Sequence, residues 1–252
     1  MTHNPLSTLP MRRFINSAVL VLAFASVAVS RAGIAQPPAS GTFITMLGKD
    51  TVAVEQYTRT AEALIGDYVT RPGQAVVNHY TVHFLADGNP GHVILSQTLA
   101  NGATIPGAPK GVQLTIGATE SVIAIERDTM INRKFAMSKT FPLLGTSFGM
   151  LELAFARLRA EHTDSGTFPG LPLDSKVQPD PIPVKFFGAD SARFWNSTGA
   201  VFLRVDQTGK ISGLSGRATS SPFEGRRVAT LDMKKLIAGF AAADAAGKGV
   251  KP

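Results

Sequence analysis

Short segments rich in β-branched residues, separated by turns of Gly, Pro, Asn and Asp, follow one another along most of this chain. This pattern is typical of antiparallel strands joined by hairpins. Thr42 to Leu47 and Thr51 to Arg59 form one such pair, and Val76 to Ala86 and His92 to Leu99 form the clearest one. Further strands are expected at residues 63–70, 112–117, 121–127, 129–135, 184–187, 194–196, 201–206, 211–214 and 226–231.

The clearest hairpin also carries a prediction of register. If the turn residues Asp87 to Gly91 form the whole loop, Ala86 lies opposite His92 and Phe84 lies opposite Ile94. One face of the hairpin is then apolar and consists of Tyr80, Val82, Phe84 and Ile94. The opposite face holds His79, Thr81 and His83. Such alternation predicts an antiparallel sheet that is buried on one side.

Two segments show helical periodicity instead. Ser147 is expected to cap a helix whose apolar stripe consists of Phe148, Leu151, Phe155 and Leu158. Asp232 is expected to cap a final helix whose apolar face consists of Met233, Leu236, Ile237 and Phe240. Residues 163–183 are rich in Gly, Pro and Asp without periodicity, which predicts a loop that crosses the sheet. The expected fold is therefore mainly β, a curved antiparallel sheet or half-barrel with one or two helices packed on it.

The N-terminal segment is expected to be a secretory signal peptide spanning residues 1–35. Arg12 and Arg13 precede an uncharged apolar run from Phe14 to Val29, which is shorter than the roughly twenty residues of a membrane-spanning helix. Small residues follow, and cleavage between Ala35 and Gln36 would release the mature chain. An extracytoplasmic location follows, either periplasmic or secreted, with residues 36–240 as one domain and residues 241–252 as a flexible tail.

Two other interpretations of the leader stay open. Arg31 follows the apolar run directly, which is unusual ahead of a cleavage site and is compatible with an uncleaved anchor. The adjacent arginines also occur in twin-arginine export signals, although the rest of that signal is poor here and general secretion is favoured. The chain contains no cysteine, so a lipoprotein anchor, disulfides and thiolate metal ligands are excluded.

Charge excludes one class of partner. Three of the 25 basic residues lie in the leader, and the mature chain keeps the other 22 against 18 acidic residues, a balance of +4. These cations are scattered, whereas a nucleic-acid partner calls for a basic stripe interleaved with aromatic residues. No nucleic-acid partner is expected, while weak attraction to anionic surfaces, and hence peripheral association with the envelope, stays open.

One motif resembles a catalytic site. Residues Gly145 to Gly149 match G-x-S-x-G, the nucleophile elbow of α/β-hydrolases. The segments before it are strands without alternating helices, and Pro142 interrupts the short segment that the elbow would need. The only histidine downstream, His162, would lie roughly 22 Å along the helix axis from Ser147. No catalytic residue is therefore predicted, and Ser147 is interpreted as a helix cap.

The histidines and aromatic residues give no assigned site either. His79 and His83 are about 13 Å apart on a strand and cannot chelate one metal ion together, although a ligand from elsewhere stays open. Asp87-Gly88-Asn89 begins like a calcium loop, but the positions that follow do not fit. No metal and no cofactor are predicted. Aromatic residues that could line an apolar ligand site or form core are Phe186, Phe187, Phe194 and Trp195.

The order of elements resembles a known family. Antiparallel strands, the amphipathic helix that starts at Ser147, further strands and a capping helix are similar to the curved half-barrels of LolA/LolB-like periplasmic proteins. In that family the concave sheet shelters acyl chains, so the resemblance implies a lipid or other hydrophobic small molecule as the partner. This chain lacks the lipoprotein cysteine of LolB, and no functional residue carries over.

The function expected from the sequence is that of an exported, non-enzymatic β-rich protein of the cell envelope that binds a lipid or other hydrophobic ligand. One alternative is an envelope hydrolase with an unrecognised active site. Another is a structural or interaction module that presents an edge strand. The sequence identifies neither the ligand-binding residues nor the oligomeric state.

Overall fold

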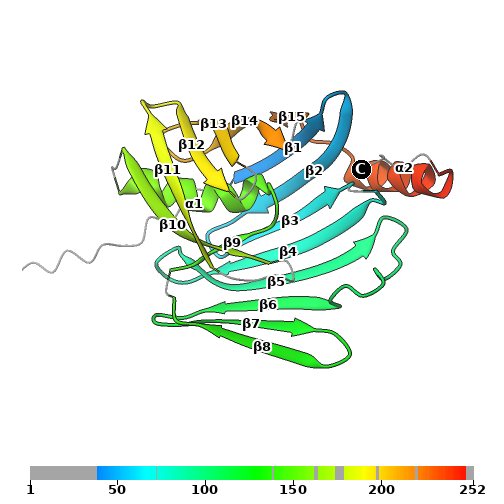
Figure 1. Ribbon diagram of the computed structural model, residues 1–252, viewed down its shortest axis with the longest axis horizontal. Coiled ribbons are helices and arrows are strands. Elements are labelled where there is room, and N and C mark those ends of the chain that lie inside the picture. The colour runs from blue at the N-terminus through cyan, green and yellow to red at the C-terminus, as the bar shows by residue number, and fades with distance from the viewer. Residues whose placement is uncertain are drawn as a thin grey trace, which may run out of the picture. The chain divides into compact units, whose positions relative to one another are not determined.

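The computed structural model describes residues 39–71, 73–137, 139–161, 164–173, 179–196, 199–218 and 221–247 (Figure 1). The chain divides into residues 1–31 and residues 32–252, and all described residues belong to the second unit. The expected signal peptide, its cleavage site between Ala35 and Gln36, and His162 lie outside the described residues.

Strands dominate the described residues. The first eight are β1 (Ala39–Leu47), β2 (Asp50–Arg59), β3 (Ala63–Thr70), β4 (Val76–Phe84), β5 (Pro90–Leu99), β6 (Gly111–Ile116), β7 (Ser121–Glu126) and β8 (Met130–Phe135). The others are β9 (Phe141–Leu143), β10 (Ser165–Pro172), β11 (Asp180–Phe187), β12 (Ser191–Asn196), β13 (Gly199–Val205), β14 (Ile211–Ala218) and β15 (Ser221–Val228). The helices are α1 (Phe148–Ala160) and α2 (Met233–Ala245).

All of these strands belong to one sheet. Strands β1 to β8 lie side by side in chain order, β1 also pairs with β15, and the sheet continues from β15 back to β9. The first and last strands therefore meet in the middle of the sheet, while β8 and β9 form its two edges. Neighbours are antiparallel except β9 and β10, which are parallel. The sheet curves without closing (Figure 1), which confirms the expected mainly β, curved antiparallel fold.

Helix α1 fills the concave side of this sheet, which we call the inner side. Its residues pack with the inward residues of the surrounding strands in one hydrophobic core. Phe148 stacks on Phe43 of β1, and Phe155 makes edge contacts with Phe168 of β10 and Phe194 of β12. The sequence predicted one apolar stripe on this helix, but nearly all of its residues are buried because the sheet surrounds it.

Helix α2 packs on the opposite, outer side. The carboxylate of Asp232 accepts a hydrogen bond from the backbone N–H of Lys235, which confirms the expected N-cap. The apolar face predicted for this helix packs against outward residues of the sheet that include Val54, Val69 and Val77. The helix continues to Ala245. Among the described residues, neither helix is long and apolar enough to cross a bilayer.

The predicted register of the β4–β5 hairpin is wrong. His83 pairs with His92 and Phe84 pairs with Pro90, next to a bulge. The loop consists of residues 85–89, where the N–H of Leu85 donates to the carbonyl of Asn89. Because the pairing shifts by an odd number of residues, β5 presents the opposite face. Ile94 therefore lies on the outer side, 42% exposed, while Tyr80 and Val82 point inward as predicted.

The predicted loop at residues 163–183 is also wrong, because strand β10 and the start of β11 lie within it. Strand β10 was not predicted because it contains Pro169, Gly170 and Pro172, and proline and glycine are uncommon in strands. Only Gly170 to Pro172 pair with the short edge strand β9. Strand β9 was not predicted, because it is three residues long and contains Pro142.

Candidate functional site

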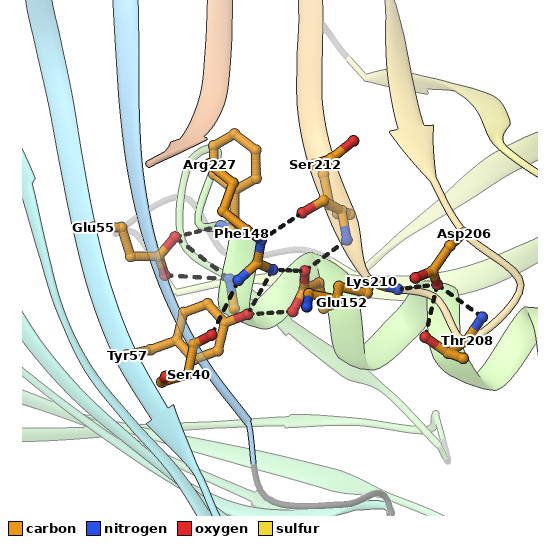
Figure 2. A network of polar contacts seen from close by, with 12 residues as sticks. Ser40, Glu55, Tyr57, Phe148, Glu152, Asp206, Thr208, Lys210, Ser212 and Arg227 are labelled. Carbon is orange, nitrogen blue, oxygen red and sulfur yellow. Dashed lines mark hydrogen bonds and ion pairs between the residues drawn. The ribbon is translucent and has the colours of Figure 1, made fainter. Parts of the chain in front are cut away.

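A buried carboxylate fixes the start of α1 to the sheet. Glu55 of β2 is 1% exposed and accepts hydrogen bonds from the hydroxyls of Tyr80 and Ser147, both at 2.6 Å. It also accepts from the backbone N–H groups of Phe148 and Gly149, which belong to the first turn of the helix (Figure 2). These N–H groups have no partner within the helix and carry its positive dipole end, so a carboxylate suits this place.

Burial raises the pKa of Glu55 to about 7, although the four donors oppose this rise. A carboxyl group with such a pKa is a frequent mark of an active site. Here every donor that reaches Glu55 comes from the core of the protein, and the side chain has no contact with solvent. Glu55 therefore serves as an anchor for α1 and is not placed to meet a substrate.

A second carboxylate anchors the middle of α1. Glu152 accepts hydrogen bonds from the hydroxyl of Tyr57, from the guanidinium of Arg227 and, at 2.6 Å, from the backbone N–H of Ile211 (Figure 2). Arg227 donates in addition to the carbonyl groups of Ile211 and Ser40, both at 3.0 Å. Burial raises the pKa of Glu152, and the positive charge of Arg227 opposes that rise. This network ties α1 to β1, β2, β14 and β15.

Ser147 is the N-cap of α1, as the sequence predicted. Its Oγ accepts from the backbone N–H of Met150 at 3.3 Å and donates to Glu55. The side chain is 1% exposed. A nucleophile needs a base in contact and a path for the substrate, whereas this hydroxyl is sealed in the core against a carboxylate. The G-x-S-x-G match is thus a helix start and not a nucleophile elbow.

The substitution Ser147→Ala is expected to lower the free energy of unfolding by about 2 kcal/mol, because it removes a cap and a hydrogen bond to a buried carboxylate. Urea denaturation measures this loss, and Ser165→Ala, at an exposed position of β10, is the matched control with little change. Fluorophosphonate probes should leave Ser147 unlabelled. Covalent labelling at this serine would contradict the assignment as a cap.

His79, His83 and His92 lie on the outer side of β4 and β5. His79 contacts Asp67 at 2.6 Å between Nδ1 and Oδ1, and the rings of His83 and His92 lie side by side with centroids 6.3 Å apart. Within the described ranges, no group of three or more His, Asp or Glu side chains could hold a metal ion. Asp67 thus lies beside His79, and His92 lies beside His83, but neither pair has a third ligand among the described residues.

The four aromatic residues noted in the sequence divide between the two sides of the sheet. Phe186 and Phe194 point inward and contact Phe155 of α1, with ring centroids 6.0 and 6.2 Å apart. Phe187 and Trp195 point outward, because neighbouring residues of a strand face opposite sides. Phe187 is 42% exposed. Phe186 and Phe194 are therefore core residues, whereas Phe187 and Trp195 belong to the outer surface of the sheet.

That surface extends over the outer side of β11 to β13. The guanidinium carbon of Arg193 lies 4.3 Å from the ring centroid of Trp195, 5.5 Å from that of Phe187 and 5.7 Å from that of Phe202. Lys185 Nζ lies 5.5 Å from the Phe187 ring. These are cation–π distances. Phe202 is 49% exposed, so two of the three rings are nearly half open to solvent.

Further cations continue this surface across the sheet. The register places Arg204 of β13, Arg217 of β14 and Arg226 of β15 on the same side as Phe202, and all three are exposed. Among the described outward positions of β11 to β15, Glu224 is the one acidic residue. We call this surface the outer aromatic-basic face, defined by Lys185, Phe187, Arg193, Trp195, Phe202, Arg204, Arg217 and Arg226.

A groove of about 930 Å³ adjoins the outer aromatic-basic face. It runs over β1, β13, β14 and β15. Its apolar lining includes Met46, Phe202, Pro222 and Phe223, and its charged lining consists of Arg217, Glu224 and Arg226. An apolar groove with a few charged groups is the usual form of a site for an amphiphilic ligand.

A second, more polar pocket of about 580 Å³ lies where the anchoring network of α1 reaches the surface. Polar side chains in its lining include Gln56, Tyr57, Asp67, Lys210 and Arg227. Tyr57 and Arg227 already bind Glu152 there. Since these two groups hold α1, they are not available to a ligand without loosening the helix.

No family model matches the chain, and no curated protein matches it. Two solved structures are similar in fold. One is a beta-barrel-like protein of the domain of unknown function DUF1849 from Brucella abortus, with a TM-score of 0.52 and 9% identity over 76% of this chain and 95% of that one. The other is a DUF1089 family protein from Pseudomonas aeruginosa, with a TM-score of 0.47 and 12% identity over 65% of this chain and 89% of that one.

The likeness to the first of these structures shows a barrel-like fold and nothing about activity, because the identity is low. A barrel-like fold is consistent with the resemblance to LolA/LolB-like proteins, and that resemblance stays a prediction. The chain is similar in its β-rich fold to a beta-barrel-like protein of a domain of unknown function.

Proposed function

We propose that the protein is an exported, non-enzymatic binding protein of the cell envelope, and that its ligand is a lipid or another hydrophobic molecule held on the outer side of the sheet. Export rests on the leader sequence before Gln36. The observation that supports the binding role is the apolar outer groove beside Phe202, an aromatic side chain that stays 49% exposed.

The inner side is a poor place for a ligand. The apolar face predicted for the hairpin includes Tyr80 and Val82, and both are completely covered by core residues. An acyl chain there would have to displace α1, whose anchors Glu55 and Glu152 would lose their partners. Leaving such groups buried without hydrogen bonds costs several kcal/mol. The outer groove is open without any rearrangement.

The test is titration of the protein with a fluorescent fatty acid, combined with native mass spectrometry of the protein as it is recovered from cells. We expect saturable uptake or copurified lipid. Phe202→Ser should weaken uptake about tenfold, because an exposed ring contributes roughly 1.4 kcal/mol when a ligand covers it. Ile94→Ser, at an equally exposed outer position on β5, is the control and should leave uptake unchanged.

Absence of bound lipid together with absence of saturable uptake by folded protein would reject the binding role. A structural or interaction role would then remain. Strand β8, at an open edge of the sheet with nearly all of its side chains exposed, is where such a module would pair with another strand.

A further inference from the structure

We infer that the outer aromatic-basic face docks the protein onto the surface of an anionic lipid bilayer. This inference rests on the proposed function and deepens it, because it names the chemistry of the partner and the surface that meets it. The face combines the two features that hold a protein at such a surface, namely cations for the headgroups and aromatic rings for the interface.

The outer aromatic-basic face carries an excess of positive charge. Five cations stand on the outward positions of β11 to β15 against Glu224 alone. In the part of the chain that the structure describes, none of the five forms an ion pair. The cations are Lys185, Arg193, Arg204, Arg217 and Arg226. Unpaired cations on one side of a sheet attract an anionic surface within a Debye length.

Cations at the other end of the sheet differ from those of the outer aromatic-basic face. On the strands and turns at the other end of the sheet, Lys110 lies 3.9 Å from Asp128, and Lys134 lies 3.3 Å from Glu120. These two exposed cations each have an acidic neighbour that offsets their charge. The cations of the outer aromatic-basic face form no ion pair among the described residues, so their charges add together against Glu224 alone.

The aromatic rings of the outer aromatic-basic face also suit a bilayer surface. Phe187, Trp195 and Phe202 surround the guanidinium of Arg193, whose Nε is buried and has no hydrogen-bond partner among the described residues. Phe187 and Phe202 are nearly half exposed. Exposed aromatic side chains favour the boundary between the headgroups and the acyl chains of a bilayer. Long basic side chains can lie along an apolar layer while their charges reach the headgroups.

The adjoining groove fits the same partner. It opens beside Phe202 and is bordered by Arg217 and Arg226. A lipid that leaves the bilayer plane could place its chain along the apolar lining while its anionic headgroup stays near these guanidinium groups. The groove and the docking surface would then act on the same molecule, an anionic lipid.

The test is sedimentation of the protein with vesicles of phosphatidylglycerol and phosphatidylcholine, compared with vesicles of phosphatidylcholine alone. We expect binding to the anionic vesicles that weakens as salt is added. The triple variant Arg204→Ala, Arg217→Ala and Arg226→Ala should bind on the order of 100-fold more weakly, about fivefold for each cation removed. Phe187→Ser with Phe202→Ser should also weaken binding, and this loss should persist at high salt.

The matched control is Lys110→Ala, Arg133→Ala and Lys134→Ala, which removes the same charge from exposed positions at the other end of the sheet. We expect less than a threefold change. If the control variant loses as much binding as the first triple variant, net charge alone is responsible and the docking surface is wrong. Near-ultraviolet circular dichroism of each variant shows that it is folded.

Two outcomes separate this inference from the proposed function. Equal binding to neutral and anionic vesicles, or fatty-acid uptake without any vesicle binding, would overturn the inference and leave the proposed function standing. Absence of both fatty-acid uptake and vesicle binding would reject the two together.

Discussion

The substitution Glu152→Ala is expected to lower the free energy of unfolding by about 4 kcal/mol. It leaves the guanidinium of Arg227 without its carboxylate partner, and it leaves the hydroxyl of Tyr57 and the backbone N–H of Ile211 without an acceptor. Removal of one partner from a buried ion pair typically costs 3–5 kcal/mol because the other charge stays behind. Urea denaturation followed by far-ultraviolet circular dichroism measures this loss.

The control removes both charges at once. Glu152→Leu combined with Arg227→Met replaces the pair by apolar side chains of similar size. The free energy of unfolding of this double variant should fall by clearly less than the sum of the losses for Glu152→Leu alone and Arg227→Met alone. The reason is that no unpaired charge remains in the double variant. If the two losses simply add, Glu152 and Arg227 act independently and the anchoring network described for α1 is incorrect.

The substitution Gly209→Ala is expected to cost about 3 kcal/mol. Gly209, in the turn between β13 and β14, has a φ of +85°, and a Cβ at this position would come closer than 3.0 Å to the backbone N and Cα of Ala156 in α1. The positive φ and the overlap each carry a cost of 1–3 kcal/mol. Neither the turn nor the helix can relieve the overlap by rotating a side chain.

Gly102→Ala is the matched control for this prediction. Gly102 has a φ of +82°, but nothing lies within 4 Å of the Cβ that alanine would add. This variant carries the backbone strain alone and should cost about 1 kcal/mol. Thermal and urea denaturation of both variants measure the difference, which reports how closely the turn packs on α1. Equal losses would mean that α1 is not held against this turn.

Local sequence patterns were sufficient to predict most of the sheet. The alternation in Thr51 to Arg59, the turn at residues 48–49 and the capping side chains of Ser147 and Asp232 act through near neighbours along the chain. These features fix strands, hairpins and helix starts without help from distant residues. The confirmed elements are those whose determinants lie within about ten residues.

Features that depend on distant residues could not be predicted. The register of β4 and β5 is a local exception, because the loop from Leu85 to Asn89 forms hydrogen bonds that replace those of the expected turn. The role of Glu55 depends on a helix more than ninety residues later. Strand β10 forms despite its prolines because β11 pairs with it along most of its length.

The outer aromatic-basic face was missed for the same reason. Its cations are spread from Lys185 to Arg226 in the sequence, so the linear charge pattern looks scattered and suggests no surface. Alternation along five neighbouring strands gathers them on one side. The aromatic residues at 186, 187, 194 and 195 were noted as lining either a ligand site or the core, and alternation sends one of each pair into the core.

Trp195 offers the most direct test that binding occurs on the outer side of the sheet, because it is the only tryptophan of the chain and belongs to the outer aromatic-basic face. Its fluorescence should shift to the blue with vesicles that contain phosphatidylglycerol, and lipids with brominated acyl chains should quench it. Bound protein whose Trp195 fluorescence neither shifts nor is quenched would contradict the account, since the outer aromatic-basic face would then lie away from the lipid.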